Sequence, residues 1–231
     1  PNIILNGYSH SSFRREELND NQNDNTNINF LFLDTNSDQN DSYLDQLVDI
    51  NYLNKLYENF FKLVLKYDNL NLTIKRKKND YLKILDRNNS FFKKILNTKR
   101  LQIIDDFLGL PPSSVSKNMD YIFALTCEDI PSALLECTQN KTKSIIIDYT
   151  NLKNIENKLY IHGENKIIFN DQAYLFEKLN IFLKQNKFDG EFGNWSNFLS
   201  EIKSFDDFNG SIRISEYISD MINNINNNIQ V

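Results

Sequence analysis

Two polar residues one helical turn apart, Ser132 and Glu136, follow an apolar stretch in the middle of the chain. The stretch, residues 121 to 125, predicts a buried parallel strand, and Pro131 suits the first turn of a following helix. Such a helix start presents free N–H groups and a positive dipole end at the carboxyl edge of a sheet, where phosphorylated ligands bind. We therefore predict that Ser132 contacts phosphate and that Glu136 accepts hydrogen bonds from a ribose. A serine that only caps the helix is the alternative.

A basic cluster, residues 75 to 78, ends a second predicted strand that covers residues 70 to 74. Side chains alternate along a strand, so Lys75 and Lys77 point to one face of the sheet and the other two cations to the opposite face. One of these pairs can face the crevice at the sheet edge and neutralise a diphosphate. The alternative is a solvated, charged surface without a ligand.

A polar loop follows the first predicted strand, residues 29 to 33. Its Thr35 hydroxyl and Asn36 amide would lie at the same carboxyl edge of the sheet. An ordinary turn between a strand and a helix explains these residue types equally well.

Composition excludes several classes of protein. The net charge of −5 disfavours general nucleic-acid binding, which relies on a basic surface. We expect no transmembrane segment, because no apolar run approaches the length that crosses a bilayer. The histidines, His10 and His162, lack partners at metal-ligand spacing, so we expect no metal and no cofactor. Cys127 and Cys137 also lack such spacing, and two thiols favour a reducing compartment.

The elements that must hold these residues alternate between strand and helix. This alternation predicts an α/β domain over residues 27–231, with a Rossmann-like, mostly parallel sheet, flanking helices and C-terminal helices. Residues 1–26 are polar and predict a linker or extension. The predicted strands cover residues 29–33, 70–74, 101–104, 121–125 and 144–148, with an extended pair around 159–161 and 167–169. The predicted helices cover residues 52–65, 80–97, 172–184, 197–202 and 212–225, with a short helix entered at Pro111.

Four segments give the chain a resemblance to a known family. They are F-L-F-L-D-T-N (residues 30–36), L-T-I-K-R-K-K (72–78), D-Y-I-F-A-L-T-C-E-D-I-P-S-A-L-L-E (120–136) and a tail that includes K-I-I-F-N-D-Q-A-Y-L-F-E-K-L (166–179) and a segment around Trp195. Together they resemble the C-terminal, nucleotide-sugar-binding half of GT-B-fold glycosyltransferases of bacterial surface-polysaccharide assembly, such as capsule or lipopolysaccharide.

The resemblance implies a donor domain that binds a nucleotide-sugar for transfer to a growing polysaccharide or glycolipid. It implies that Ser132, Lys75 or Lys77, and nearby Thr35 and Asn36 bind the diphosphate, and that Glu136 holds the ribose. It also implies a glycan or lipid-linked acceptor, a second GT-B domain as partner, and a cytoplasmic location or peripheral attachment at the inner face of the membrane. The catalytic residues stay unassigned.

Two departures from the family keep other functions open. The chain contains one α/β domain, and residues 1–26 are too short to form the N-terminal acceptor domain of a complete enzyme. Glu128 and Asp129 bring negative charge to the loop where the family has small residues beside the diphosphate. A nucleotide-sugar epimerase of the same fold and a non-catalytic nucleotide-sugar-binding or interaction module are therefore the alternatives.

Overall fold

The fold was analysed in a computed structural model of the 231-residue chain. The chain divides into two units, which are described separately: Asn23–Trp195, and a second that comprises Pro1–Gln22 and Ser196–Val231. The structure describes residues 27–34, 48, 50–76, 90–104, 110–126, 130–139, 142–150, 158–198 and 210–229.

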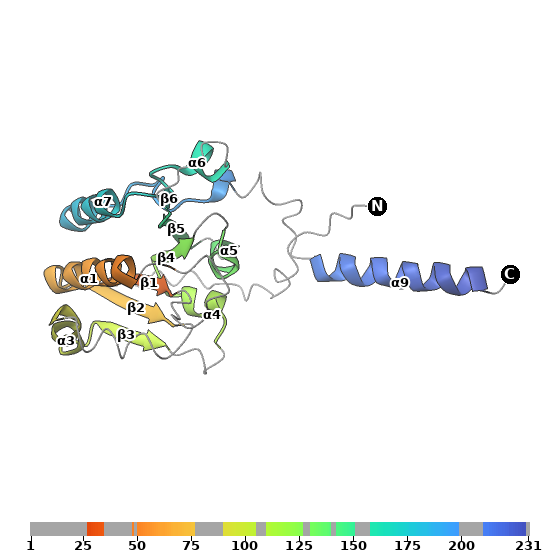
Figure 1. Ribbon diagram of the computed structural model, residues 1–231, viewed down its shortest axis with the longest axis horizontal. Coiled ribbons are helices and arrows are strands. Elements are labelled where there is room, and N and C mark those ends of the chain that lie inside the picture. The colour runs from red at the N-terminus through yellow and green to blue at the C-terminus, as the bar shows by residue number, and fades with distance from the viewer. Residues whose placement is uncertain are drawn as a thin grey trace. The chain divides into compact units, whose positions relative to one another are not determined.

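The first unit is built on a six-stranded sheet with the strand order β3-β2-β1-β4-β5-β6 (Figure 1). Every pairing between neighbouring strands is parallel. The prediction of a Rossmann-like α/β fold is therefore confirmed. The strands are β1 (Ile28–Leu33), β2 (Leu70–Lys75), β3 (Leu101–Ile104), β4 (Tyr121–Thr126), β5 (Lys143–Asp148) and β6 (Ile168–Phe169).

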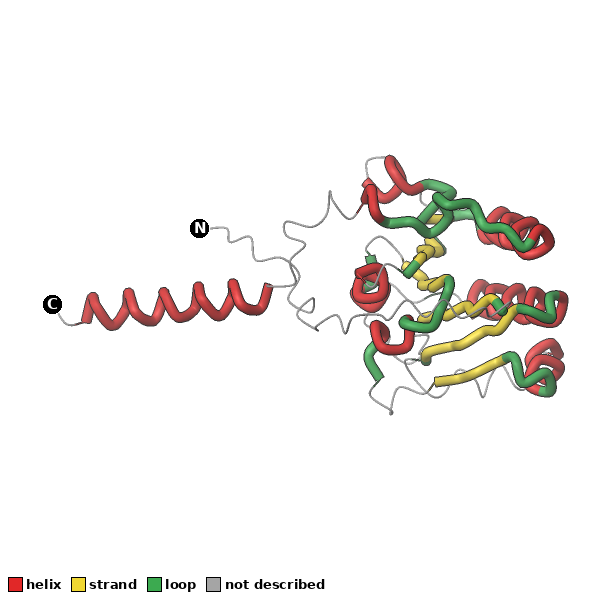
Figure 2. Tube along the Cα trace, turned by 180° about the vertical axis from the view of Figure 1, so that it is seen from behind, coloured by secondary structure: helices red, strands yellow, loops and turns green. Residues whose placement is uncertain are grey.

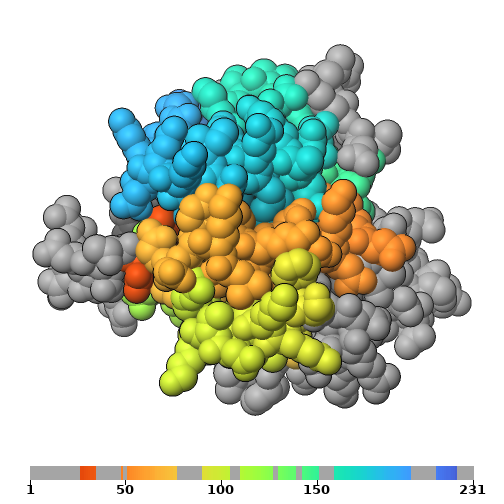
Figure 3. All heavy atoms as spheres, turned by 90° about the vertical axis from the view of Figure 1, so that its left-hand side faces the viewer, coloured from red at the N-terminus to blue at the C-terminus, as the bar shows by residue number. Residues whose placement is uncertain are grey.

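Helices cover both faces of this sheet (Figures 1 and 2). On one face, α1, α3 and α7 pack over the sheet, and Figure 3 shows α1 between the other two. On the opposite face, α5 packs against β4 and β5 and contacts α4. The helices of this unit are α1 (Ile50–Lys66), α3 (Ser90–Leu96), α4 (Pro112–Ser116), α5 (Ser132–Gln139), α6 (Lys158–Gly163) and α7 (Gln172–Gln185).

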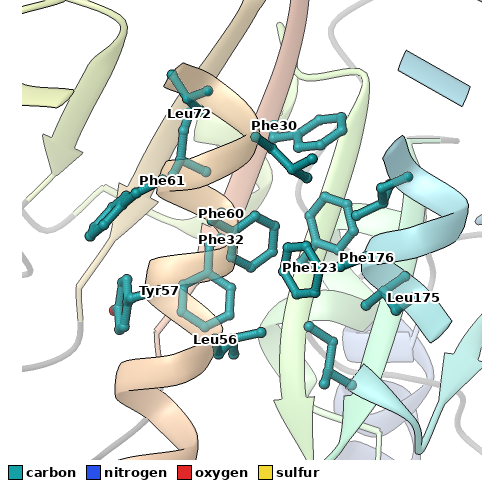
Figure 4. Packing of buried hydrophobic residues seen from close by; sticks show 14 of the residues in the cluster. Phe30, Phe32, Leu56, Tyr57, Phe60, Phe61, Leu72, Phe123, Leu175 and Phe176 are labelled. Carbon is teal, nitrogen blue, oxygen red and sulfur yellow. The ribbon is translucent and has the colours of Figure 1, made fainter. Parts of the chain in front are cut away.

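An aromatic core lies between the sheet and α1, α3 and α7. Large side chains recur every three or four residues along α1, which turns one apolar face of this helix toward the sheet. Phe60 of α1 meets Phe123 of β4 at 5.1 Å between ring centroids and Phe176 of α7 at 4.9 Å. Figure 4 shows these rings together with Phe30 and Phe32 of β1. The core therefore fixes α1 and α7 against the central strands.

The segment after the last helix of this unit is tied back to β5. The indole Nε1 of Trp195 donates to the carbonyl oxygen of Ser144 at 2.7 Å, and the Trp195 side chain is buried. Gly193 has a positive φ of 72°, which glycine adopts without strain. A side chain at this position would meet the backbone nitrogen of Ser144 at 3.1 Å. Trp195 is therefore a packing residue of this unit.

One predicted element is wrong. Residues 159–161, expected as a strand, belong to helix α6, whereas the strand expected around residues 167–169 is present as β6. The helix expected over residues 80–97 is described only as α3, because residues 77–89 lie outside the described residues. The predicted linker, residues 1–26, also lies outside them.

The second unit contains helix α9 (Gly210–Ile229). Its apolar residues Ile214, Ile218 and Met221 follow helical spacing and share one face. Among the helices that the structure describes, α9 included, none is long and apolar enough to cross a membrane.

Candidate functional site

The strand order reverses between β1 and β4, which are neighbours in the sheet although two strands separate them in sequence. From β1 the chain proceeds outward to β2 and β3, and it then returns to β4 on the other side. Open α/β sheets bind ligands in the crevice outside the carboxyl ends of the two strands at such a reversal. Here these ends are Leu33 and Thr126.

Helix α5 begins beside this crevice, after the end of β4. The amides of Leu134 and Leu135 donate to the carbonyl oxygen of Pro131 at 2.9 and 3.0 Å. The amides of Ser132 and Ala133 precede these bonds and are therefore the N–H groups left for a ligand at the helix start. Ser132 is exposed, and its hydroxyl makes no hydrogen bond within the described part of the chain.

Glu136 lies one turn along α5 from Ser132 and is half-buried. Its neighbours Leu134 and Cys137 are buried and hold α5 on the sheet. Residues four positions apart on a helix share one side, so Glu136 and Ser132 lie on the same side of α5. The contact between Glu136 and a ribose stays a prediction.

Lys75 lies on the face of the sheet that α5 covers. Leu72 and Ile74 of the same strand belong to the core under α1, so alternation turns Lys75 to the other face. The register aligns Lys75 with Leu33, and Leu33 in turn with Ala124. Because neighbouring strands are about 4.8 Å apart, the α-carbons of Lys75 and Ala124 are separated by about 10 Å.

The Lys75 ammonium must extend along the strand direction to approach the start of α5. Thr126, where β4 ends, is two residues, or about 6.6 Å, nearer the sheet edge than Ala124. Arg76 is turned to the core face and is only 6% exposed. Lys75 and Ser132 therefore share one face near one edge. Thr35, Asn36 and Lys77, which were predicted to join them, lie outside the described residues.

The described part of the edge offers little for nucleophilic or metal chemistry. Burial raises the pKa of the Cys137 thiol to about 12, despite a hydrogen bond with Ser116. Cys137 is therefore protonated at neutral pH and unsuited to attack a substrate. Among the described residues, no group of three or more His, Cys, Asp or Glu side chains could hold a metal ion. The described residues of this edge offer helix amides, the Ser132 hydroxyl and the Lys75 ammonium.

A second polar feature at the same edge was not predicted from the sequence. We call it the tyrosine–aspartate cluster, and it consists of Tyr52, Asp148 and Tyr160. Asp148 ends β5, is 3% exposed, and accepts hydrogen bonds from the Tyr160 hydroxyl and from the amide and hydroxyl of Thr150, the latter two at 2.9 and 2.7 Å.

The remaining member of the cluster, Tyr52, comes from the start of α1. Burial raises the pKa of Tyr52, and the negative charges of Asp148 and Asp171 add to this shift. Tyr52 therefore lies within the electrostatic field of both carboxylates. The only sequence signal was an aspartate that ends a buried strand at residue 148.

The chain matches no family model, no curated protein and no solved structure.

Proposed function

We propose that this chain is a nucleotide-sugar-binding domain, the donor half of a GT-B-fold glycosyltransferase that assembles a surface polysaccharide or glycolipid. The observation that carries the proposal is the start of α5 beside the reversal between β1 and β4. Ser132, the Ala133 amide and Lys75 supply a hydroxyl, free N–H groups and a cation near that point.

These groups suit the stabilisation of a leaving diphosphate. Glycosyl transfer from a nucleotide-sugar releases a nucleoside diphosphate, and oriented amides with a cation stabilise its developing charge. Glu136 then accepts the ribose hydroxyls. Under this proposal, the complete enzyme also has an acceptor site and a second GT-B domain. It acts at the inner face of a membrane that carries a lipid-linked acceptor.

The test is a thermal-unfolding screen of the full chain against nucleoside mono- and diphosphates and nucleotide-sugars. A ligand at a hundred times its dissociation constant should add about 2.7 kcal/mol to the free energy of unfolding. Ser132→Ala and Glu136→Ala should each weaken the selected ligand about tenfold, because each removes a hydrogen bond that involves a charged group. Unfolding without ligand should change little for Ser132→Ala, since this side chain is exposed.

Glu177→Ala is the matched control for Glu136→Ala, because Glu177 is exposed on α7 over the other face of the sheet. It should leave nucleotide affinity unchanged. The proposal fails if no nucleotide stabilises the chain. The site assignment fails if a nucleotide stabilises the chain but neither Ser132→Ala nor Glu136→Ala lowers the affinity for it.

The lysine assignment has its own test. The double variant Lys75→Ala with Lys77→Ala should lower the affinity for a nucleoside diphosphate at least tenfold and the affinity for the nucleoside less than twofold. The reason is that only the diphosphate carries the charge that the lysines neutralise. Isothermal titration calorimetry measures both affinities. The double variant Lys184→Ala with Lys187→Ala removes the same charge at the exposed end of α7 and should change neither affinity. Equal losses of affinity for the nucleoside and for the diphosphate would rule out a phosphate-binding role of the two lysines.

A further inference from the structure

Helix α9 carries an apolar face that is open to solvent. At about 100° per residue, the large apolar side chains between residues 214 and 222 fall within about 140° of the helix circumference. They are Ile214, Tyr217, Ile218, Met221 and Ile222. The last three are between 46% and 52% exposed, and Tyr217 is 38% exposed. A gathering of exposed apolar side chains of this kind marks a surface for association.

The charged residues of α9 lie on the other side of the helix and narrow the kind of partner. Arg213 and Asp220 flank the edge of the apolar face at Tyr217, and Glu216 lies furthest from that face. A helix that binds an anionic membrane surface is rich in lysine and arginine on its polar face. Helix α9 contains one arginine, two acidic residues and no lysine. Its charge therefore disfavours a lipid surface as the partner.

The spacing of the apolar residues suits a second helix of the same kind. Ile214, Ile218 and Met221 are separated by four and three residues, which is the alternation of positions d and a in a coiled coil. Two helices with this spacing interlock these side chains along one seam. In the described part of the chain outside α9, no helix or strand carries more than two exposed large apolar residues. The described surface that matches the apolar face of α9 is therefore α9 itself.

The two flanking charges indicate the direction of the pairing. In an antiparallel pair with a two-fold axis between residues 216 and 217, Arg213 of each helix lies at the level of Asp220 of the other helix. Opposite charges then meet twice along the same side of the seam. In a parallel pair, Arg213 would face Arg213 and Asp220 would face Asp220. Antiparallel helix dipoles add to the preference.

We propose that α9 pairs with α9 of a second copy of this chain as an antiparallel dimer. Ile214, Ile218 and Met221 form the seam, and Arg213 and Asp220 of opposite copies set the direction. This dimerisation surface involves α9 alone and is independent of nucleotide binding by the sheet unit.

The test is sedimentation equilibrium of the full chain. A seam along one 20-residue helix is about 30 Å long and buries less than the about 800 Å² per partner of a standard stable interface. We therefore expect a reversible equilibrium between monomer and dimer, with a dissociation constant in the micromolar range. Ile218→Asp should raise this constant at least about a hundredfold, because it places a carboxylate in the seam.

Ser219→Asp is the matched control for Ile218→Asp. It introduces the same residue and the same charge at the next position of the helix, outside the apolar face. It should change the dissociation constant by less than about threefold. Circular dichroism of both variants checks that they have the same helix content.

Exchanging the flanking charges tests the antiparallel arrangement. Arg213→Asp and Asp220→Arg should each raise the dissociation constant about tenfold, because each turns two attractions into two repulsions. The double variant that carries both changes restores opposite charges at each contact. Its dissociation constant should return to within about threefold of that of the unchanged chain.

Three results would overturn the proposal. The first is a chain that stays monomeric at every concentration, and the second is a dimer that Ile218→Asp leaves intact, because another surface then joins the copies. The third is a monomeric chain that sediments with phosphatidylcholine vesicles unless Ile218 is replaced by aspartate, because lipid then covers the apolar face. Without recovery in the double charge exchange, the antiparallel arrangement is wrong.

Discussion

Replacing Phe123 by alanine is expected to lower the free energy of unfolding by about 3–5 kcal/mol. Phe123 lies at the centre of the core, fully buried, with its ring centroid 5.0 Å from that of Phe30 and 5.1 Å from that of Phe60. Truncation removes buried apolar area and leaves a cavity between β4 and α1 that rigid neighbouring strands cannot close. A loss of this size is a large fraction of the stability of a typical domain.

Urea denaturation followed by circular dichroism measures this loss. Ile181→Ala is the control, because Ile181 is 45% exposed on α7 and alanine is a good helix former. It should change the free energy of unfolding by no more than about 0.5 kcal/mol. A loss below about 1 kcal/mol for Phe123→Ala would contradict the central position that we assign to this ring.

The parts of the fold that were predictable from sequence are those with a strong local pattern. Helix α1 carries apolar residues at helical spacing over 17 residues, and β4 and β5 are continuous apolar runs, so each element could be recognised in isolation. The prediction of a parallel sheet followed from the alternation of strands and helices along the chain. The start of α5 at Ser132 followed from the proline before it.

Helix α6 was misassigned because its local pattern is ambiguous. Its sequence, K-L-Y-I-H-G, is short and contains aromatic and β-branched residues that favour strands. Tertiary contacts decide the outcome, since Leu159 and Tyr160 are both buried and the Tyr160 hydroxyl bonds to Asp148. A six-residue segment has too few positions for periodicity to separate helix from strand.

The tyrosine–aspartate cluster was missed for a different reason. Its members come from α1, the end of β5 and α6, which are far apart in sequence. Each is unremarkable where it stands, and only the fold brings the Tyr160 hydroxyl of α6 to Asp148 at the end of β5. Nucleotide-site residues were easier to propose, because a strand followed by a helix start marks them locally.

The second large effect is expected at Asp148. Asp148→Ala should lower the free energy of unfolding by about 2–4 kcal/mol, because three donors lose a shared buried acceptor. Two of these donors belong to Thr150, whose amide and hydroxyl hold the chain directly after β5. The third, the Tyr160 hydroxyl, fixes α6 against the strand end. Urea denaturation at neutral pH measures the loss.

The variant Asp148→Asn tests whether the hydrogen-bond acceptor at this position accounts for the loss of stability. Asparagine keeps one carbonyl oxygen for Thr150 and fills the same volume, so its loss should be about 1 kcal/mol. Tyr160→Phe removes only one donor and should cost a similar amount. If Asp148→Ala costs no more than Asp148→Asn, the hydrogen bonds do not stabilise this edge.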